Sequence, residues 1–193
     1  MKQLKRCGWV KEGDKLMEEY HDQEWGVPLR EDNKIFEFLI LESFQAGLSW
    51  RTVLNKRNNF KKAFVGFDPA KVAKFSKNDL KRLLNDEGII RNKLKIQAAI
   101  NNAQRFLEIK NEFGTFSKYM WQFVHDKPIV NKINKITDYK PLSREAEIWS
   151  KDLKKRGFKF LGATTLYAHM QAIGMVNDHM TECFKKKHAV KSK

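Results

Sequence analysis

The sequence SKNDLKRLLNDEGIIRNKLKIQAAINNAQRFLEI, residues 76–109, predicts two helices joined by a short turn around a glycine. Ser76 and Asp79 have the spacing of a capping box, and the leucines after them follow a helical period. Gly88 interrupts this pattern, and a longer helix is expected over about residues 92–109. Strand patterns are scarce along the whole chain. We therefore predict an all-α fold of eight or nine short helices.

Further helices are expected wherever a capping residue precedes apolar residues at helical spacing. Their expected ranges are 14–26, 32–47, 49–66, 143–157 and 164–175, with a short helix after Asp68-Pro69. Residues 125–142, with Pro128 and Pro141, are expected to form the longest irregular stretch. Because no repeat, low-complexity tract or linker divides the chain, we predict one domain over residues 1–193.

The composition indicates a compact protein without membrane segments. The chain has 193 residues, of which 41% are hydrophobic, and this is enough for a sizeable core. No apolar run approaches the roughly 18 residues that a membrane span needs, and the basic N-terminus lacks the apolar region of a secretory signal. Two cysteines are too few for a disulfide scaffold. We expect a cytosolic protein that does not contact membranes.

The charge distribution points to a polyanionic partner. The chain carries 38 Lys and Arg against 23 Asp and Glu, a formal net charge of +15. Residues 1–50 hold 7 basic and 10 acidic side chains, and residues 51–193 hold 31 and 13. Nucleic acid is the commonest partner of such a basic chain, so a phosphate-facing surface is expected from residues 51–193. For the lysines of the tail, residues 185–193, the alternative of a solvated, disordered segment is favoured.

Two cysteines and two histidines near the ends of the chain form a candidate zinc site. His179 and Cys183 are four residues apart and share one side of a helical turn, while Cys7 and His21 lie near the N-terminus. Together they make a Cys2His2 set, which would occupy all four coordination positions of a tetrahedral zinc ion. Such a site has no position open for water and is therefore structural rather than catalytic. Such a site would clip residues 1–28 to residues 176–184. The alternative is an ordinary surface pair and a buried thiol.

Glu42 is the candidate functional carboxylate. At helical spacing its neighbours are Phe38, Gln45 and Ala46, which places a carboxylate on a largely apolar face. Because an isolated buried carboxylate is unfavourable, this one needs a partner, a raised pKa or a ligand. The alternative is a boundary glutamate that reaches solvent or pairs with a lysine.

Aromatic residues are concentrated around this carboxylate in the sequence. Three of the five tryptophans, Trp9, Trp25 and Trp50, fall within the first fifty residues, together with Tyr20. Such side chains stack on bases and attract cations, although they also fill protein cores. The turn from Asp86 to Asn92 adds a possible phosphate contact, because successive backbone amides at the start of a helix can bind an anion. Many similar turns bind nothing.

Six motifs, in order over nearly the whole chain, closely resemble the bacterial 3-methyladenine DNA glycosylase I family of the helix-hairpin-helix glycosylase superfamily. They are Cys7-Gly-Trp9, Tyr20-His-Asp-Gln-Glu-Trp-Gly-Val-Pro28, Leu41-Glu-x-x-Gln-Ala-Gly-Leu-Ser-Trp50, Gly88-Ile-Ile-Arg91, Lys154-Lys-Arg-Gly-Phe-Lys-Phe160 and Val176-Asn-Asp-His179. The resemblance implies an all-α enzyme of base-excision DNA repair that hydrolyses the N-glycosidic bond of 3-methyladenine in alkylated double-stranded DNA.

The resemblance also implies a role for individual residues. Glu42 is expected to be the catalytic and base-binding carboxylate. The expected base-binding aromatics are Tyr20, Trp50 and Trp9; the expected DNA contacts are Leu48, Gly88, Ile89, Ile90 and Arg91; and the expected ligands of one structural zinc ion are Cys7, His21, His179 and Cys183. Leu48 takes the place of a residue that the family wedges into DNA. A monomeric bacterial protein of the cytoplasm, working at the nucleoid, is expected.

Two departures from the family pattern, Met17 and Phe44, are expected to affect the rim of the pocket. They leave open a wider range that includes other methylpurines. The catalytic aspartate that usually follows the hairpin in the superfamily has no counterpart in this sequence. The resemblance to the 3-methyladenine DNA glycosylase I family leads us to expect this absence. Two other functions remain as alternatives: a catalytically inert, zinc-containing DNA-binding module, and a bifunctional lyase that uses an amine nucleophile.

Overall fold

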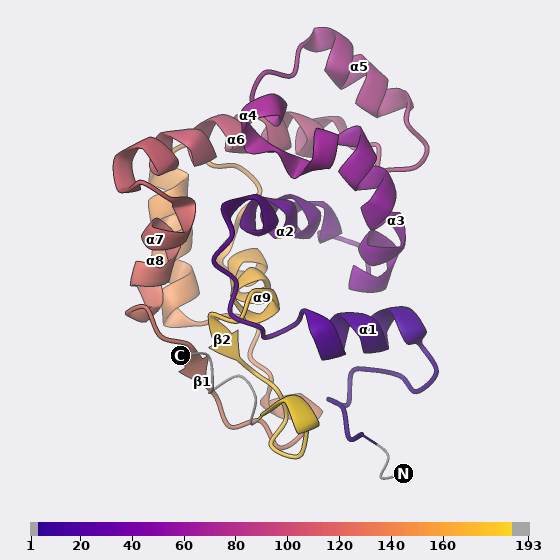
Figure 1. Cartoon of the computed structure of the whole chain (residues 1–193), viewed down its shortest axis with the longest axis vertical. Helices are drawn as coiled ribbons and strands as arrows, with labels where there is room; N and C mark the ends of the chain where they lie inside the picture. Colours follow the sequence, from indigo (N-terminus) through magenta and orange to yellow (C-terminus); the bar gives the residue numbers. More distant parts are fainter. Residues whose placement is uncertain (1–3, 187–193) are drawn as a thin grey trace.

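The computed structural model describes residues 4–186, and the nine α-helices within this range confirm the predicted all-α fold (Figure 1). The α-helices are α1 (Lys15–Gln23), α2 (Asp32–Gln45), α3 (Trp50–Ala63), α4 (Pro69–Val72), α5 (Lys77–Asn85), α6 (Lys93–Phe113), α7 (Phe116–Trp121), α8 (Arg144–Lys155) and α9 (Ala163–Ala172). Three short 3-10 segments are η1 (Val65–Phe67), η2 (Gln122–Val124) and η3 (Ile136–Asp138), and the two strands are β1 (Ile129–Val130) and β2 (Val176–Asn177). Helix α7 had not been predicted.

Helix α2 forms the centre of the core. All ten residues from Ile35 to Phe44 are buried, which is typical of a helix enclosed on every side. Helices α3, α6, α7 and α9 pack against α2, and Figure 1 shows α6 above it and α9 below it. Two buried glutamates interrupt this apolar helix. Glu37 binds Arg57 at 2.7 Å and Lys34 at 3.1 Å, whereas Glu42 has no lysine or arginine partner among the described residues.

Most of the predicted caps are confirmed. Among the predicted capping residues, Asp14, Ser49, Asp68, Ser76 and Ser143 each accept a hydrogen bond from a backbone amide of the first helical turn. Asp32 differs, because α2 is preceded by Glu31, which makes no such bond. The Asp32 carboxylate instead accepts the amides of Phe116 and Ser117 at 3.2 and 3.0 Å. It therefore caps α7 and joins two helices distant in sequence.

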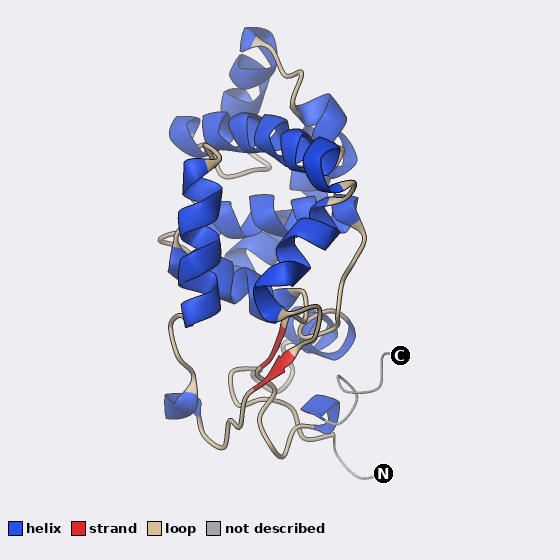
Figure 2. Ribbon diagram, turned by 90° about the vertical axis from the view of Figure 1, so that its left-hand side faces the viewer, coloured by secondary structure: helices blue, strands red, loops and turns tan. Residues whose placement is uncertain are grey.

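The irregular stretch 125–142 lies beside the C-terminal segment. Its strand β1 pairs in parallel with β2, with Ile129 opposite Val176, and a further bridge joins Ile133 and Met180. Figure 2 shows the helices stacked at one end of the molecule and this strand pair, with its long loops, toward the other. The pairing holds the segment after β2 next to the irregular stretch.

The predicted basic tail, residues 185–193, lies mostly outside the described residues, which end at residue 186. Lys185 and Lys186 belong to a described 3-10 turn. The Lys186 ammonium group donates to the carbonyl oxygens of Asn131 and Asn177. Lys186 therefore links the C-terminal segment to β2 and the neighbouring loop.

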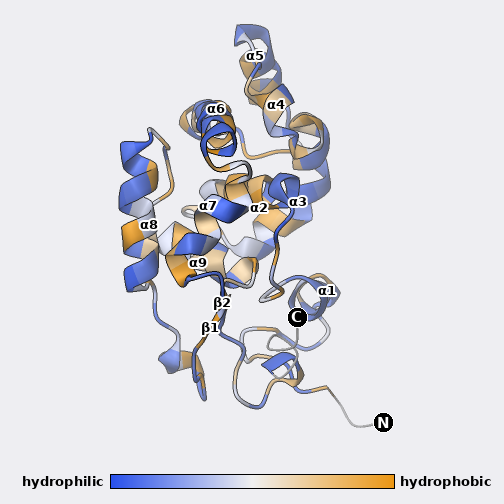
Figure 3. Ribbon diagram, turned by 60° about the vertical axis from the view of Figure 1, so that its left-hand side comes forward, coloured by the Kyte–Doolittle hydropathy of each residue, from blue (hydrophilic) through white to orange (hydrophobic). Residues whose placement is uncertain are grey.

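Hydrophobic side chains concentrate on the central helices. Figure 3 shows hydrophobic residues on α2 and α9 and mostly hydrophilic residues on α5 and α8. Among residues 4–186, no helix has both the length and the apolar character required to cross a bilayer.

Candidate functional site

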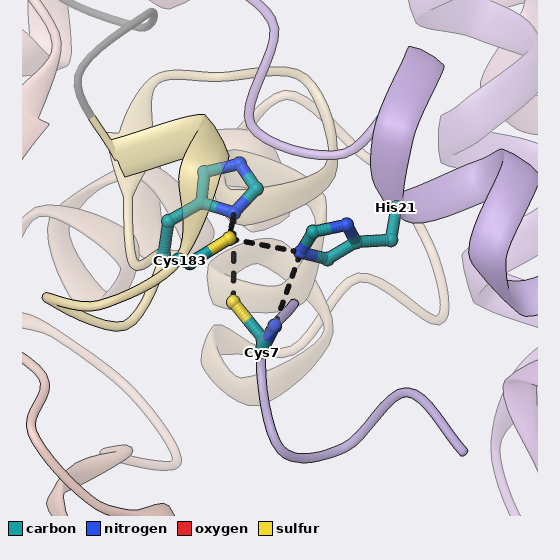
Figure 4. Close-up of side chains that lie close together, drawn as sticks. Cys7, His21 and Cys183 are labelled. Carbon is teal, nitrogen blue, oxygen red and sulfur yellow. Dashed lines mark hydrogen bonds between the residues drawn. The ribbon is translucent and has the colours of Figure 1, made fainter. Parts of the chain in front are cut away.

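The four predicted metal ligands converge in one buried cluster. Cys7 precedes α1, His21 lies on α1, and His179 and Cys183 follow β2; their four potential ligand atoms lie within 4.8 Å of one another. Figure 4 shows Cys7, His21 and Cys183 pointing toward one another. The prediction that residues near both ends of the chain form one cluster is confirmed.

The spacing of these atoms fits a tetrahedral zinc ion. Zinc–sulfur bonds of about 2.3 Å and zinc–nitrogen bonds of about 2.0–2.1 Å place tetrahedral sulfur and nitrogen ligands roughly 3.5 Å apart. Cys183 Sγ lies 3.4 Å from His21 Nε2 and 3.6 Å from His179 Nδ1. Cys7 Sγ lies 3.5 Å from the same His179 nitrogen. A zinc ion bound by all four side chains would have no position left for water, as in structural sites.

Both imidazoles are oriented by a second hydrogen bond. His21 Nδ1 lies 2.7 Å from the carboxylate of Asp22, which is itself held by Arg6 at 2.7 Å. His179 Nε2 lies 3.1 Å from the carbonyl oxygen of Trp25. Partners of this kind fix the ring and its tautomer, so that the other nitrogen faces the cluster.

The two buried thiols interact, and each shifts the pKa of the other in the opposite direction. A hydrogen bond from Cys7 lowers the pKa of the Cys183 thiol, with further contributions from His179 and His21. The same sulfur–sulfur contact, together with burial, raises the pKa of Cys7. A divalent cation bound between the two sulfurs would favour the thiolate form of both.

The ligand-bearing turns depend on close backbone contacts. His179 and Cys183 lie on a hydrogen-bonded turn, with Cys183 N donating to Met180 O at 2.8 Å, rather than on the predicted helical turn. Gly26 has φ +75°, and a Cβ there would lie 2.7 Å from His179 Nε2. A Cβ at Gly174 would lie 2.4 Å from the nitrogen of Pro28. These glycines let the turn after α1 pack directly against the C-terminal segment.

A cavity of about 220 Å³ lies next to this cluster. It is lined by side chains from the segment before α1, from α1 and the turn after it, from α2, α3 and α9, and from the loop after η3. The lining residues are Trp9, Met17, Tyr20, Trp25, Glu42, Gln45, Trp50, Tyr139, Ala168 and Gln171. All four residues predicted to bind a base are therefore brought together around one cavity.

Glu42 is the acidic residue of the cavity lining. It is 4% exposed, its Oε2 atom has no hydrogen-bond partner, and burial raises the pKa of its carboxyl group well above the ordinary value. Buried carboxylates are normally paired or hydrogen-bonded. An unpaired carboxyl group that faces a cavity therefore suggests a ligand with a positive charge or a hydrogen-bond donor.

The cavity walls are aromatic. The rings of Tyr20 and Trp50 lie 5.5 Å apart at an angle of 52°, and Trp50 Nε1 has no hydrogen-bond partner. Burial, and then the charge of Glu42, raise the pKa of Tyr20, so that its hydroxyl group stays neutral. Trp9 contacts Trp25 edge-on at 5.1 Å and His21 at 5.3 Å. Trp9 thus belongs both to the cavity wall and to the shell of the Cys/His cluster.

Sequence reasoning missed several lining residues. Tyr139 comes from the irregular stretch, and its buried hydroxyl group has no hydrogen-bond partner. Gln171 on α9 has no local motif that would reveal it. Met17 does line the cavity as expected, whereas Phe44 does not. The expectation for Phe44 is wrong because its ring is fully buried against Phe60, 4.8 Å away, in the core.

Leu48 lies in an exposed loop next to the cavity-lining residues Gln45 and Trp50. Gly47 has φ +82°, the Leu48 amide donates to Gln45 O, and the Leu48 side chain is 42% exposed. The ammonium group of Lys95 donates to the carbonyl oxygens of Phe44 and Ala46, at 2.9 Å in each case. An apolar side chain is thereby presented to solvent by a loop that is held in place at its base.

The hairpin between α5 and α6 carries four of the residues predicted to contact DNA, from Gly88 to Arg91. Gly88 and Ile89 donate their amides to Asp86, and the Ile89 side chain is buried. Within residues 4–186, the amides of Ile90 and Arg91 have no hydrogen-bond acceptor, and the Arg91 side chain is exposed. The groups of this hairpin that are available to a phosphate are therefore those at residues 90 and 91.

Comparison with known proteins gives a consistent result. Residues 9–186 match the model of the methyladenine glycosylase family. The chain is 46% identical over 180 residues to DNA-3-methyladenine glycosylase 1 of Escherichia coli (strain K12), covering 93% of this chain and 96% of that protein. It is 43% identical over 178 residues to DNA-3-methyladenine glycosylase of Haemophilus influenzae, covering 92% and 96%.

Solved structures show the same similarity in three dimensions. A crystal structure of 3-methyladenine DNA glycosylase I superposes with a TM-score of 0.90 at 44% identity, covering 93% of this chain and 98% of that chain. The Staphylococcus aureus 3-methyladenine DNA glycosylase I, whose structure addresses 3-methyladenine recognition, superposes with a TM-score of 0.90 at 37% identity, covering 94% and 96%.

Proposed function

The chain belongs to the methyladenine glycosylase family, and we propose that it hydrolyses the N-glycosyl bond of 3-methyladenine in alkylated double-stranded DNA. The observation that carries this proposal is the buried Glu42 carboxyl group without a partner, facing an aromatic cavity of about 220 Å³. A purine is flat, and N3-methylation of adenine in DNA gives it a positive charge. The cavity offers both flat aromatic walls and an acidic group.

Recognition of the base requires that it leave the helix. A base inside a duplex is inaccessible, so the nucleotide is extruded at a cost of a few kcal/mol. Leu48, exposed beside the cavity, would fill the gap in the base stack. The free amides at Ile90 and Arg91 would bind phosphate, and Lys56, whose ammonium group lies 3.1 Å from Glu87 O, would add positive charge beside the hairpin.

Excision follows from the charge of the lesion. The N-glycosyl bond breaks with its electron pair passing to the cationic base, which leaves as a neutral molecule and needs no proton from an acid. Positive charge then develops on the sugar, and water adds to it and loses a proton. Glu42 would favour the cationic base over neutral adenine and stabilise the cationic sugar. Tyr20 and Trp50 would contribute stacking and cation–π attraction of about 1–2 kcal/mol.

The Cys/His cluster is proposed to hold one structural zinc ion. Bound there, zinc would supply a cross-link between the segments 1–28 and 176–184 and the charge that keeps both thiols deprotonated. The support is the donor set, the spacing of the ligand atoms, and the hydrogen bonds that the imidazoles of His21 and His179 donate to the Asp22 carboxylate and the Trp25 carbonyl oxygen. Because Trp9 and Trp25 contact the ligand histidines and also line the cavity, the metal would stabilise one wall of the base pocket.

The other functions are less well supported by the cavity. An inert DNA-binding module has no need of an unpaired buried carboxyl group. A lyase needs an amine nucleophile, and neither lysine nor a terminal amine is among the residues that line the cavity. A wider range of methylpurines is the second candidate, because the flexible Met17 side chain lines the pocket and can adapt to other shapes. A bacterial cytoplasmic monomer is the expected setting.

The test is to incubate the protein with methylated DNA and identify the released bases by chromatography, with Glu42→Gln in parallel. We expect release of 3-methyladenine alone, and its loss in the variant with the fold retained. Release of further methylpurines would favour the wider-range enzyme. Absence of any release by a folded, DNA-binding, zinc-containing protein would favour the binding module.

The metal is tested separately with Cys183→Ser. We expect this variant to contain much less zinc and to unfold more readily than the wild type. Full zinc occupancy in the variant would contradict the proposed ligand set.

A further inference from the structure

His169 lies on α9 directly behind Glu42. Its side chain is fully buried, and neither ring nitrogen has a hydrogen-bond partner. The carboxyl group of Glu42 on α2 lies nearby, with 4.0 Å between His169 Nδ1 and Glu42 Oε1. This separation lies about 0.5–1 Å beyond hydrogen-bond range, so that a small side-chain movement would close it.

An imidazole is an unusual choice for this position. Buried polar side chains nearly always have hydrogen-bond partners. The ring centre of Trp149 lies 5.7 Å from that of His169, and the nearby α9 residues Leu166 and Met170 are also fully buried. An aromatic hydrocarbon ring would fill this space without leaving two nitrogens unsatisfied. The polarity of the ring therefore calls for a partner, and Glu42 is the group within reach.

We propose that His169 is a positioning residue for Glu42, whose carboxylate it stabilises by donating a hydrogen bond from Nδ1 when a cationic base occupies the pocket. This inference rests on the proposed function, because it concerns the residue that recognises the base. His169 itself does not line the cavity and does not touch the base.

A neutral imidazole is well suited to this role. Burial lowers the pKa of His169 to about 3, so the ring is uncharged near neutral pH and carries one N–H. It can stabilise a carboxylate as a hydrogen-bond donor without placing a positive charge in the pocket. A lysine or arginine at this point would neutralise Glu42 and repel a cationic base.

The other charged and titratable groups nearby have partners of their own or are neutral. Tyr20 and Tyr139, which line the cavity with Glu42, are neutral because burial raises their pKa values. The charged groups on the elements packed around Glu42 and His169 have partners: Arg57 is bound to Glu24 and Glu37, Lys95 to carbonyl oxygens, Asp32 to Lys110, Asp152 to Tyr119 and Arg156, and Asp178 to Tyr167 and Gln171. Titration of the pair is therefore expected to be dominated by Glu42 itself.

Base binding and proton release are then coupled. Burial raises the pKa of Glu42 in the empty pocket, which favours the protonated carboxyl. Entry of a cationic base favours the carboxylate, and the proton of Glu42 passes to water. A donor at His169 makes this ionisation easier. Excision should therefore weaken as the pH falls, and removal of the donor should move the acid limb of the pH profile upward.

The first test is nitrogen-15 NMR of histidine side chains in the wild-type protein, with His169→Phe to assign the signals. The spectra are recorded at high pH, where Glu42 is ionised, and we expect His169 to be a neutral ring protonated at Nδ1 there. A ring protonated only at Nε2 at that pH, or a doubly protonated ring, would overturn the proposal. This measurement requires no activity, so its result is distinguishable from failure of the proposed function.

The second test compares single-turnover excision across pH in the wild type, His169→Phe and His169→Asn. For His169→Phe we expect the acid limb to move up by about one pH unit, the effect of losing one hydrogen bond to a charged group. In His169→Asn the amide N–H can take the place of Nδ1–H, so the acid limb of its pH profile should lie close to that of the wild type. The matched control is His125→Asn at an exposed position, which should leave the profile unchanged.

Carbon-13 titration of the Glu42 carboxyl group provides the same comparison without DNA. It should show a higher midpoint in His169→Phe than in the wild type. An unchanged midpoint and an unchanged pH profile in a folded His169→Phe would show that the ring only fills space. If that variant does not fold, His169→Asn and the NMR tautomer decide the question.

Discussion

The ammonium group of Lys95, on the first turn of α6, donates a 2.9 Å hydrogen bond to the carbonyl oxygen of Ala46, in the loop that follows α2. Helix α6 begins directly after the hairpin, and the loop carries Leu48. One buried side chain therefore connects the element proposed to bind phosphate with the element proposed to enter the base stack. The two elements are held in a fixed relation before DNA binds.

Lys95→Met should loosen the Leu48 loop. The substitution keeps the length of the side chain and removes two hydrogen bonds to carbonyl oxygens, those of Phe44 and Ala46. We expect a loss of about 1–3 kcal/mol in the free energy of unfolding, measured with urea, and slower excision from duplex DNA. Lys93→Met is the matched control, because Lys93 is exposed on the same turn. Equal stability of the two variants would show that Lys95 does not hold the loop.

Leu48→Ala should impair action on duplex DNA without affecting the fold. The side chain is 42% exposed, so its truncation should change the free energy of unfolding by no more than about 0.5 kcal/mol. Loss of its apolar contact within the base stack should slow excision at least about tenfold. Binding of free 3-methyladenine, followed by tryptophan fluorescence, should be unaffected. Leu142→Ala, another exposed leucine, serves as control; equal excision by both variants would remove Leu48 from the mechanism.

Glu42→Gln should make the protein more stable near neutral pH and much less active. Burial raises the pKa of Glu42 above its ordinary value of 4.5. At a pH between the ordinary pKa of the unfolded chain and the raised pKa of the folded protein, the folded protein holds a proton that the unfolded chain has released. The free energy of unfolding therefore falls as the pH rises through this range. Glutamine has the same shape and avoids ionisation. Excision should fall about a hundredfold or more, as for other groups that stabilise charge in a transition state.

The measurement is urea unfolding of wild type and Glu42→Gln from pH 4 to pH 8. The stability difference should be small at the acid end and should grow in favour of the variant as the pH rises. A variant that is less stable than the wild type at pH 8 would show that the carboxylate has a stabilising partner, in contradiction to its unpaired Oε2.

Much of the fold follows from local signals. Ser49, Ser76 and Ser143 cap the helices that the sequence predicts there, because these interactions lie within four residues of chain. Asp32 shows the limit: it resembles a cap of its own helix but binds the amides at the start of α7. Helix α7 and the β1–β2 pair depend on such distant contacts and were not predicted.

The residues of the candidate site also fall into a predicted group and a group that the sequence did not reveal. Cys7, His21, His179 and Cys183 were predicted as one set, because their chemistry identifies them even across 172 residues of sequence separation. Tyr139 and His169 were missed, since Tyr139 lies in an irregular loop and His169 on α9, a mostly apolar helix without a recognisable motif. Their significance comes from buried polar atoms without partners, which only a three-dimensional arrangement reveals.

Gly26→Ala should weaken metal binding through direct contact with a ligand. Gly26 has φ +75°, and a Cβ there would lie 2.7 Å from His179 Nε2. Gly13 has a similar φ of +80°, but a Cβ there meets nothing within 4 Å. Both substitutions impose the strain of a left-handed backbone, about 1–2 kcal/mol. Only the first should also displace His179 from its hydrogen bond to Trp25 O.

We therefore expect Gly13→Ala to lose only the backbone strain energy and to keep its zinc, whereas Gly26→Ala should lose more stability and bind zinc roughly 10–100-fold more weakly, as when other outer-shell partners of a ligand are removed. Zinc content and chelator competition, measured for both variants with urea unfolding, check this. Because the two glycines share their backbone conformation, the difference between the variants isolates the contact with His179. Equal zinc affinity in both would mean that the close approach of Gly26 does not position the histidine.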